Sequence, residues 1–227
     1  MRKYNKDIIE LNEPNWKSVL PAVKFIDSGN KLINENKKPV NNTKYDPWKY
    51  ETIEQYLVNK WVLSEDKVLQ IGNGYGYIAL TVNSRLHNKK YHIVIEPNSK
   101  IIKILKYNRK KFKGKFKITK KIISSKPLIQ VIQDQQSRDY IQDEVIAPDI
   151  FFKKYDIIFN VLIVNNEICI ESLLKNMKEI LQQLELIIFK KDNTDICNYN
   201  VINLLLQEAQ FTLRESLVDS LYQVWSK

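Results

Sequence analysis

Short apolar runs alternate with amphipathic stretches from about residue 47 to the end of the chain. Short apolar runs are typical of buried strands, whereas apolar residues three or four apart are typical of helices that pack on one side. The pattern predicts strands over 67–71, 91–96, 116–123, 155–164 and 184–189 and helices over 47–61, 76–86, 98–112, 167–183 and 195–210. Largely apolar strands that alternate with helices indicate an α/β protein, in which a parallel sheet is covered on both faces.

Three segments depart from this alternation. Residues 1–45 are polar and contain three prolines, so we expect an N-terminal arm with one short helix near 16–26, followed by a single domain over 46–227. Residues 124–153 interrupt the rhythm and are interpreted as a possible extra strand over 127–132 and a polar loop. The last segment, 211–227, predicts two short strands that would close the sheet.

Three of the five glycines fall within residues 72–76, between the first predicted strand and the helix that follows it. Glycines let the backbone turn sharply and leave room for a ligand to lie against it. Glu96 comes twenty residues after Gly76, at the tip of the next predicted strand. A glycine turn after one strand and an acid after the next is how nucleotide-binding folds hold a ribose.

The glycine spacing distinguishes between two ligands. A dinucleotide fingerprint has Gly-x-Gly-x-x-Gly, but here Tyr77 occupies the last position and the third glycine comes one residue earlier. The resulting Gly-x-Gly-x-Gly is similar to the first motif of class I methyltransferases, which bind S-adenosylmethionine. The alternative is a glycine-rich turn in another α/β domain, with Glu96 a solvated strand end.

The resemblance implies a Rossmann-like class I methyltransferase fold, with a mostly parallel seven-stranded sheet and helices on both faces. Its terminal strand pair would match the one predicted at the end of this chain. The cofactor-binding residues that it implies are Gly72, Asn73, Gly74, Tyr75, Gly76, Glu96 and Pro97.

A closer resemblance is to the FkbM-type methyltransferases, over roughly residues 46–190. The stretch Ile71-Gly72-Asn73-Gly74-Tyr75-Gly76-Tyr77-Ile78-Ala79-Leu80 is similar to that family's Asp-Ile-Gly-Ala-Asn-Ile-Gly-Tyr-Tyr-Ser-Leu. Ile95-Glu96-Pro97-Asn98 matches its Phe-Glu-Pro-Asn. This resemblance implies O-methylation of a small-molecule or glycan acceptor, most simply a sugar or nucleotide-sugar hydroxyl.

The chain departs from the family at positions that bear on catalysis. Gln70 stands where the family has an acid, and Ile163 and Asn165 replace a lysine and an aspartate after the fourth strand. Glu167 survives there and is our candidate general base, with Asn165 orienting cofactor or acceptor; alternatively, Glu167 caps the helix that follows. The departures also allow a second hypothesis, a catalytically inactive methyltransferase fold that serves as a binding subunit.

Other candidate residues are more ambiguous. Glu51, on the helix before the first strand, is expected to contact the methionine amino group of the cofactor or else to be an exposed helix residue. His87 and His92 are expected to be structural. We predict no bound metal; the alternative is a magnesium site with oxygen ligands from Asn165, Asp192 and Asn193.

Charge points to a possible polynucleotide partner. The chain has 36 Lys and Arg against 26 Asp and Glu, a net charge of +10, and much of the excess lies in residues 100–121. This stretch is either a surface that binds phosphate, nucleic acid or a nucleotide-linked substrate or simply the solvated face of a helix. An RNA methyltransferase would also need accessible aromatic residues, and of Tyr107, Phe112 and Phe116 we expect two to be buried.

Compartment and membrane association are predicted from weaker signals. No apolar run of about 18 residues is present, and no apolar segment follows the first residues as in a secretory signal. The two cysteines, Cys169 and Cys197, fit a reducing compartment. We therefore expect a cytoplasmic protein with no membrane partner.

Overall fold

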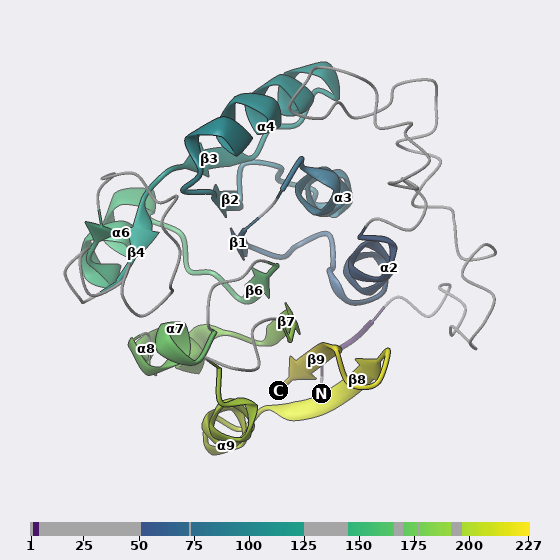
Figure 1. Cartoon of the computed structure of the whole chain (residues 1–227), viewed down its shortest axis with the longest axis vertical. Helices are drawn as coiled ribbons and strands as arrows, with labels where there is room; N and C mark the ends of the chain where they lie inside the picture. Colours follow the sequence, from purple (N-terminus) through teal and green to yellow (C-terminus); the bar gives the residue numbers. More distant parts are fainter. Residues whose placement is uncertain are drawn as a thin grey trace.

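The computed structural model describes residues 2–4, 51–72, 74–124, 145–165, 170–176, 178–191 and 197–227. Seven strands form one sheet in the order β3-β2-β1-β6-β7-β9-β8 (Figure 1). Their bounds are β1 Val68–Ile71, β2 His92–Ile95, β3 Lys117–Thr119, β6 Val161–Val164, β7 Leu186–Lys190, β8 Thr212–Leu217 and β9 Tyr222–Ser226. β1, β2, β3, β6 and β7 are parallel, and β9 runs antiparallel to both β7 and β8. The mostly parallel seven-stranded sheet and its closing strand pair are as predicted.

Helices cover both faces of the sheet. One side carries α2 (Thr52–Trp61), α3 (Tyr77–Arg85) and α4 (Ser99–Lys111), and the other carries α6 (Pro148–Tyr155), α7 (Ile170–Asn176), α8 (Lys178–Gln183) and α9 (Tyr199–Glu208) (Figure 1). Alternate strand residues enter separate apolar clusters: Leu69 packs with the residues of α6 to α9, and Val68 with those of α2 and α3. Burial on both faces is why these strands read as continuous apolar runs.

The segment around residue 150 differs from the prediction of a loop and a long strand. Residues 148–155 form α6, which starts at Pro148 and is followed by Asp156, whose φ of 51° is left-handed. Phe151 is fully buried and packs in an edge-to-face contact against Phe152, with ring centroids 5.2 Å apart. The strand itself begins only at Val161.

The strand predicted over 116–123 is also divided. β3 ends at Thr119, and β4 (Ile122–Ile123) pairs with β5 (Val145–Ile146) in a separate two-stranded sheet. Lys120 and Lys121 lie between the two strands. The extra strand predicted over 127–132 and the short helix near 16–26 lie outside the described residues, and the division into an arm and a domain stays a prediction.

The described N-terminal residues are bonded to Lys227, which directly follows β9. The backbone N–H of Arg2 donates to the carbonyl of Lys227 at 3.1 Å. Its guanidinium pairs with the buried carboxylate of Asp66 and with Glu185, the latter at 3.0 Å. Ion pairs and a backbone hydrogen bond therefore hold these first residues beside β9.

A polar cluster joins α2 to β8. The Glu215 carboxylate accepts hydrogen bonds from Trp61 Nε1 at 2.6 Å, Tyr56 OH at 3.1 Å and the buried Lys60 Nζ at 3.1 Å. Removing one partner of such a network leaves the others without their acceptor. We expect Glu215→Ala to lower the free energy of unfolding by about 2–3 kcal/mol, measured by urea denaturation. Glu208→Ala, on the exposed side of α9, is the control, and an equal loss there would contradict this role for Glu215.

Two further expectations bear on compartment. Cys197 is buried and disulfide-bonded, contrary to the expectation of two reduced cysteines; Cys169 lies outside the described residues. Among the residues that the structure describes, no helix has the length and apolar character needed to cross a membrane.

Candidate functional site

The order of the strands reverses beside β1. The chain passes from β1 to β2 and β3 on one side and then returns to place β6 on the other. At the carboxyl edge, the N–H of Asn165, after β6, donates to the Ile71 carbonyl at 2.9 Å, and the N–H of Gly72, after β1, donates to the Ile95 carbonyl at 2.9 Å. In open α/β sheets ligands bind at this edge, where the strand order reverses.

The turn between β1 and α3 depends on its glycines. Gly72, Gly74 and Gly76 have φ values of 73°, 50° and 107°, a region that other residues rarely adopt. Gly74 faces Glu51, since a Cβ built on it would lie in van der Waals contact with Glu51 Oε1, at 3.4 Å. On the other side, Asn108 Nδ2 donates to the Tyr75 carbonyl at 2.9 Å, which ties the turn to α4. The glycines thus keep bare backbone at the edge of the sheet.

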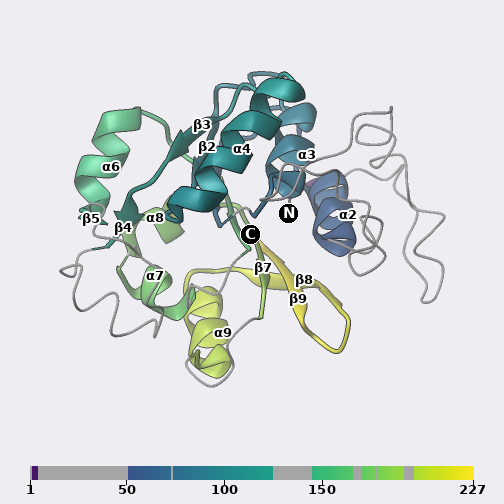
Figure 2. The same cartoon turned by 45° about the horizontal axis from the view of Figure 1, so that its top comes forward.

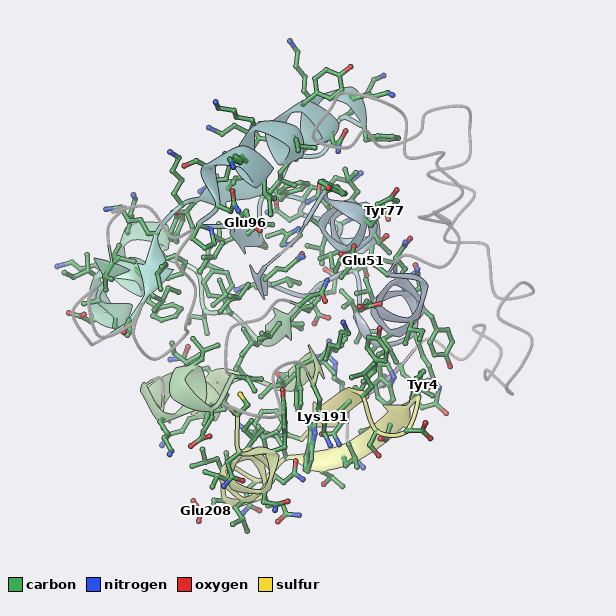
Figure 3. The ribbon with its side chains drawn as sticks, viewed as in Figure 1. Tyr4, Glu51, Tyr77, Glu96, Lys191 and Glu208 are labelled. Carbon is green, nitrogen blue, oxygen red and sulfur yellow. The ribbon has the colours of Figure 1, made fainter. Side chains whose placement is uncertain are left out.

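Glu51 lies against this turn, beside α3 (Figure 3). Its Oε1 accepts a hydrogen bond from Asn165 Nδ2 at 3.1 Å, while Oε2 is buried without a partner among the described residues. Its φ of 56° is left-handed and marks the start of α2. Glu51 is therefore partly buried at the start of α2, and the alternative of an exposed helix residue is wrong, while its contact with the cofactor stays a prediction.

Burial raises the pKa of the Glu51 carboxyl well above its usual value of 4.5, and the negative charge of Glu54 raises it further. The Asn165 amide, a backbone hydrogen bond from Ile78 and the positive charge of Lys190 act in the opposite direction and only partly offset these effects. Glu54 was not identified from the sequence as a neighbour of Glu51, although residues three apart lie on the same side of a helix. A cation beside Oε2 would favour the charged form.

Glu96 follows β2 and is 6% exposed, so the alternative of a solvated strand end is wrong. Its Oε1 accepts the backbone N–H of Asn98 at 3.0 Å. The Asn98 side chain in turn caps α4 by accepting the N–H groups of Lys100 and Ile101. Pro97 is buried between them. These contacts fix the carboxylate at the same edge as the glycine turn.

Gln70 connects the glycine turn to a buried histidine. Its amide Nε2 donates to the Gly72 carbonyl at 3.1 Å, and its Oε1 lies 3.1 Å from His92 Nε2. Both side chains are completely buried. Burial lowers the pKa of His92 to about 3, so the ring is neutral and Nε2 donates to Gln70. An amide thus supports the turn at the position where the FkbM-type pattern has an acid, and the buried contact of His92 with Gln70 agrees with the structural role predicted for this histidine.

Asn73, Glu167, Asp192 and Asn193 lie outside the described residues. Within the described part of the chain, no group of three or more His, Cys, Asp or Glu residues is arranged to hold a metal ion. The structure therefore brings together Glu51, Asn165, Gln70, Glu96 and the glycine turn, and the role of Glu167 stays a prediction.

The strand order, the glycine turn and the acid after β2 together define the Rossmann-like fold of class I methyltransferases. Solved structures agree. A precorrin-6y C5,15-methyltransferase from Geobacter metallireducens matches with a TM-score of 0.51 and 10% identity, over 87% of this chain and 97% of that one. A protein thought to be an RNA methyltransferase, from Pyrococcus horikoshii, matches with a TM-score of 0.50 and 13% identity, over 93% and 96% of the two chains.

Neither a protein-family model nor a curated protein matches this sequence. At identities this low the similarity to solved structures shows the fold alone. The FkbM-type resemblance therefore stays a prediction.

Proposed function

We propose that this protein is an S-adenosylmethionine-dependent methyltransferase. The observation that carries the proposal is the turn of three left-handed glycines at the edge where the strand order reverses, with one buried carboxylate on each side. Glu96 is suited to accept hydrogen bonds from the two ribose hydroxyls, since a carboxylate has two acceptor oxygens. Glu51 is suited to bind the ammonium of the methionine part, because its Oε2 is buried without a partner in the described structure.

Methyl transfer mainly requires the protein to position the methyl donor and the acceptor. When bound, the cofactor would supply an electrophilic methyl group on a sulfonium: an acceptor nucleophile attacks the methyl carbon in line with the carbon–sulfur bond, and S-adenosylhomocysteine leaves. The glycine turn, Glu51 and Glu96 would fix the donor, and such positioning supplies much of the rate. A general base that removes the acceptor's proton typically adds about 10²–10⁴-fold, and Glu167 remains our candidate for that role.

The acceptor is less constrained. The sequence favours a hydroxyl of a sugar or nucleotide sugar, and the comparisons add no support for that class. The similar structure from Geobacter metallireducens is a precorrin methyltransferase, and the one from Pyrococcus horikoshii is thought to act on RNA. We retain O-methylation of a small hydroxylated molecule as a proposal, together with the alternative of an inactive binding subunit.

Thermal unfolding with and without S-adenosylmethionine tests the cofactor assignment. A ligand at about 100 times its dissociation constant stabilises the folded state by about 2.7 kcal/mol, which corresponds to a rise in Tm of about 5–10 °C for a domain of this size. The demethylated product, S-adenosylhomocysteine, should give a similar rise. No shift with either compound would contradict the proposal, and binding without transfer to any acceptor would favour the inactive subunit.

Replacement of Glu51 by Gln is expected to separate stability from binding. The folded state holds the Glu51 proton to a higher pH than the unfolded chain, so ligand-free stability falls as the pH rises above 4.5 through the raised pKa. At pH 8, Glu51→Gln should therefore raise the free energy of unfolding by about 1–3 kcal/mol. It should also weaken cofactor binding by about 10–100-fold, through loss of a charged hydrogen bond.

Denaturant unfolding and calorimetric titration measure the two effects of Glu51→Gln. Glu65→Gln is the matched control because Glu65 is exposed on a turn, and it should change neither quantity. Unchanged cofactor affinity in the Glu51 variant would show that this carboxylate does not bind the ligand.

A further inference from the structure

The outer face of α4 is strongly basic. Its exposed lysines are Lys100, Lys103, Lys106, Lys110 and Lys111. Three more exposed lysines, Lys113, Lys115 and Lys117, follow between the end of α4 and the start of β3. Figure 2 shows α4 on the outside of the molecule with β3 beside it, and Figure 3 shows nitrogen-tipped side chains projecting outward from this helix. No Asp or Glu occurs between Asn98 and Ser124.

Three of these lysines are not paired with an acidic residue in the described part of the chain. Lys103, Lys106 and Lys110 form no ion pair with any described residue. By contrast, the buried Lys60 and the exposed Lys175 each pair with a glutamate, at 3.1 and 2.6 Å. Like charges along one helix repel one another. A polyanion bound along α4 would therefore reduce the electrostatic repulsion that is present in the free protein.

An aromatic ring lies within this basic face. Tyr107 is 49% exposed, and its spacing of four residues from Lys103 and three from Lys110 places all three on the same side of α4. Of the other two aromatic residues in the stretch, Phe116 is buried and Phe112 is partly buried. An exposed ring between lysines offers a surface on which an unpaired base can stack.

The direction of α4 connects this face to the candidate site. The helix begins two residues after Pro97, where Asn98 caps it and donates its N–H to Glu96. Its 13 residues extend for about 20 Å, long enough for several phosphates of a bound strand to contact its lysines. A strand that lies along α4 therefore has one end beside the carboxylate that we assign to the cofactor.

We propose that the outer face of α4 binds single-stranded nucleic acid and leads it to the methyl-transfer site, which makes a nucleotide the acceptor in place of the small molecule that the sequence favours. Two alternatives explain less. An amphipathic helix on a membrane inserts its apolar face, but the apolar residues of α4, Ile102 and Leu105 among them, are buried against the protein. A merely solvated lysine face would give no role to the exposed Tyr107. As an acceptor site the surface rests on the proposed function, whereas its binding can be tested without the cofactor.

Fluorescence anisotropy with a labelled single-stranded RNA of about 12 nucleotides, a length within known site sizes, tests the proposal. The native chain should bind, with affinity falling as salt rises. Lys103→Ala/Lys106→Ala should weaken binding by about tenfold at low salt and reduce the slope of log K against log salt by about 1.4, since each phosphate contact contributes about 0.7. Tyr107→Ala should weaken binding by about 5–100-fold with little change of slope.

The matched control is Lys3→Ala/Lys175→Ala, which removes the same charge from two exposed lysines. Lys3 lies at the N-terminus and Lys175 on α7, on the other side of the sheet from α4 in Figure 1. An equal loss in this control, tighter binding to a duplex of the same length, or preference for anionic phospholipid vesicles would overturn the proposal. If the protein binds RNA but S-adenosylmethionine causes no thermal shift, α4 is supported as a nucleic-acid-binding surface and the proposed methyltransferase function is contradicted.

Discussion

S-adenosylmethionine should bind the Glu96→Ala protein at least about 100-fold more weakly than the native chain. Hydrogen bonds to a charged group contribute about 1.5–3 kcal/mol each, and a carboxylate at this position is placed to accept two from a ribose. Glu96 is 6% exposed, so little water is available to replace it. Isothermal titration calorimetry measures the loss directly.

The control for Glu96→Ala must separate binding from folding, because Glu96 Oε1 also accepts the N–H of Asn98. Glu96→Gln retains an oxygen for that contact but supplies only one acceptor to the ribose. It should keep the native thermal unfolding without ligand and still bind at least about tenfold more weakly. Native affinity in both variants would remove Glu96 from the site.

Acid is expected to destabilise this protein through His92. The folded-state pKa of about 3 lies below the usual 6.5, so the unfolded chain takes up a proton that the folded chain does not accept until much lower pH. Stability from this group is complete above about pH 6.5 and is lost as the pH falls toward 3. The full loss is about 4–5 kcal/mol, of which roughly half should appear by pH 5. Urea denaturation at a series of pH values measures it.

The chain has two histidines, so His87 is the matched control for His92. His87 is exposed, and His87→Gln should leave the pH dependence unchanged. His92→Gln should lower stability at pH 7, because the contact with Phe116 at 5.3 Å is lost, but should flatten the acid slope. A slope that persists in His92→Gln would mean that other groups cause the acid sensitivity.

Most of the fold could be predicted from the local pattern of apolar and polar residues. The prediction failed where no glycine or proline marks the boundary between two elements. The strands beside β1 are apolar on both sides, and the helices between them have one apolar face. α6 was missed because Phe151, Phe152 and Tyr155 lead almost directly into the apolar residues of β6. The break between them is Asp156 in a left-handed conformation, and no glycine marks it.

The glycine turn and Glu96 could be predicted because each directly follows a strand that is recognisable in the sequence. Glu51 was left open because its hydrogen bond to Asn165 joins residues 114 apart in sequence. The contact of Gln70 with His92 depends on strand register, in which Val68 lies opposite His92 in the neighbouring strand. Such contacts follow from the assembled sheet and have no local signature.

The link from His92 through Gln70 to Gly72 has an evolutionary consequence. An aspartate at position 70 has no proton to donate to the Gly72 carbonyl, and beside His92 it would draw a proton onto the ring and create a buried ion pair. Positions 70 and 92 should therefore change together among relatives of this chain, an acid at 70 appearing with a residue other than histidine at 92. A change at either position alone should be selected against, although neither side chain reaches the surface.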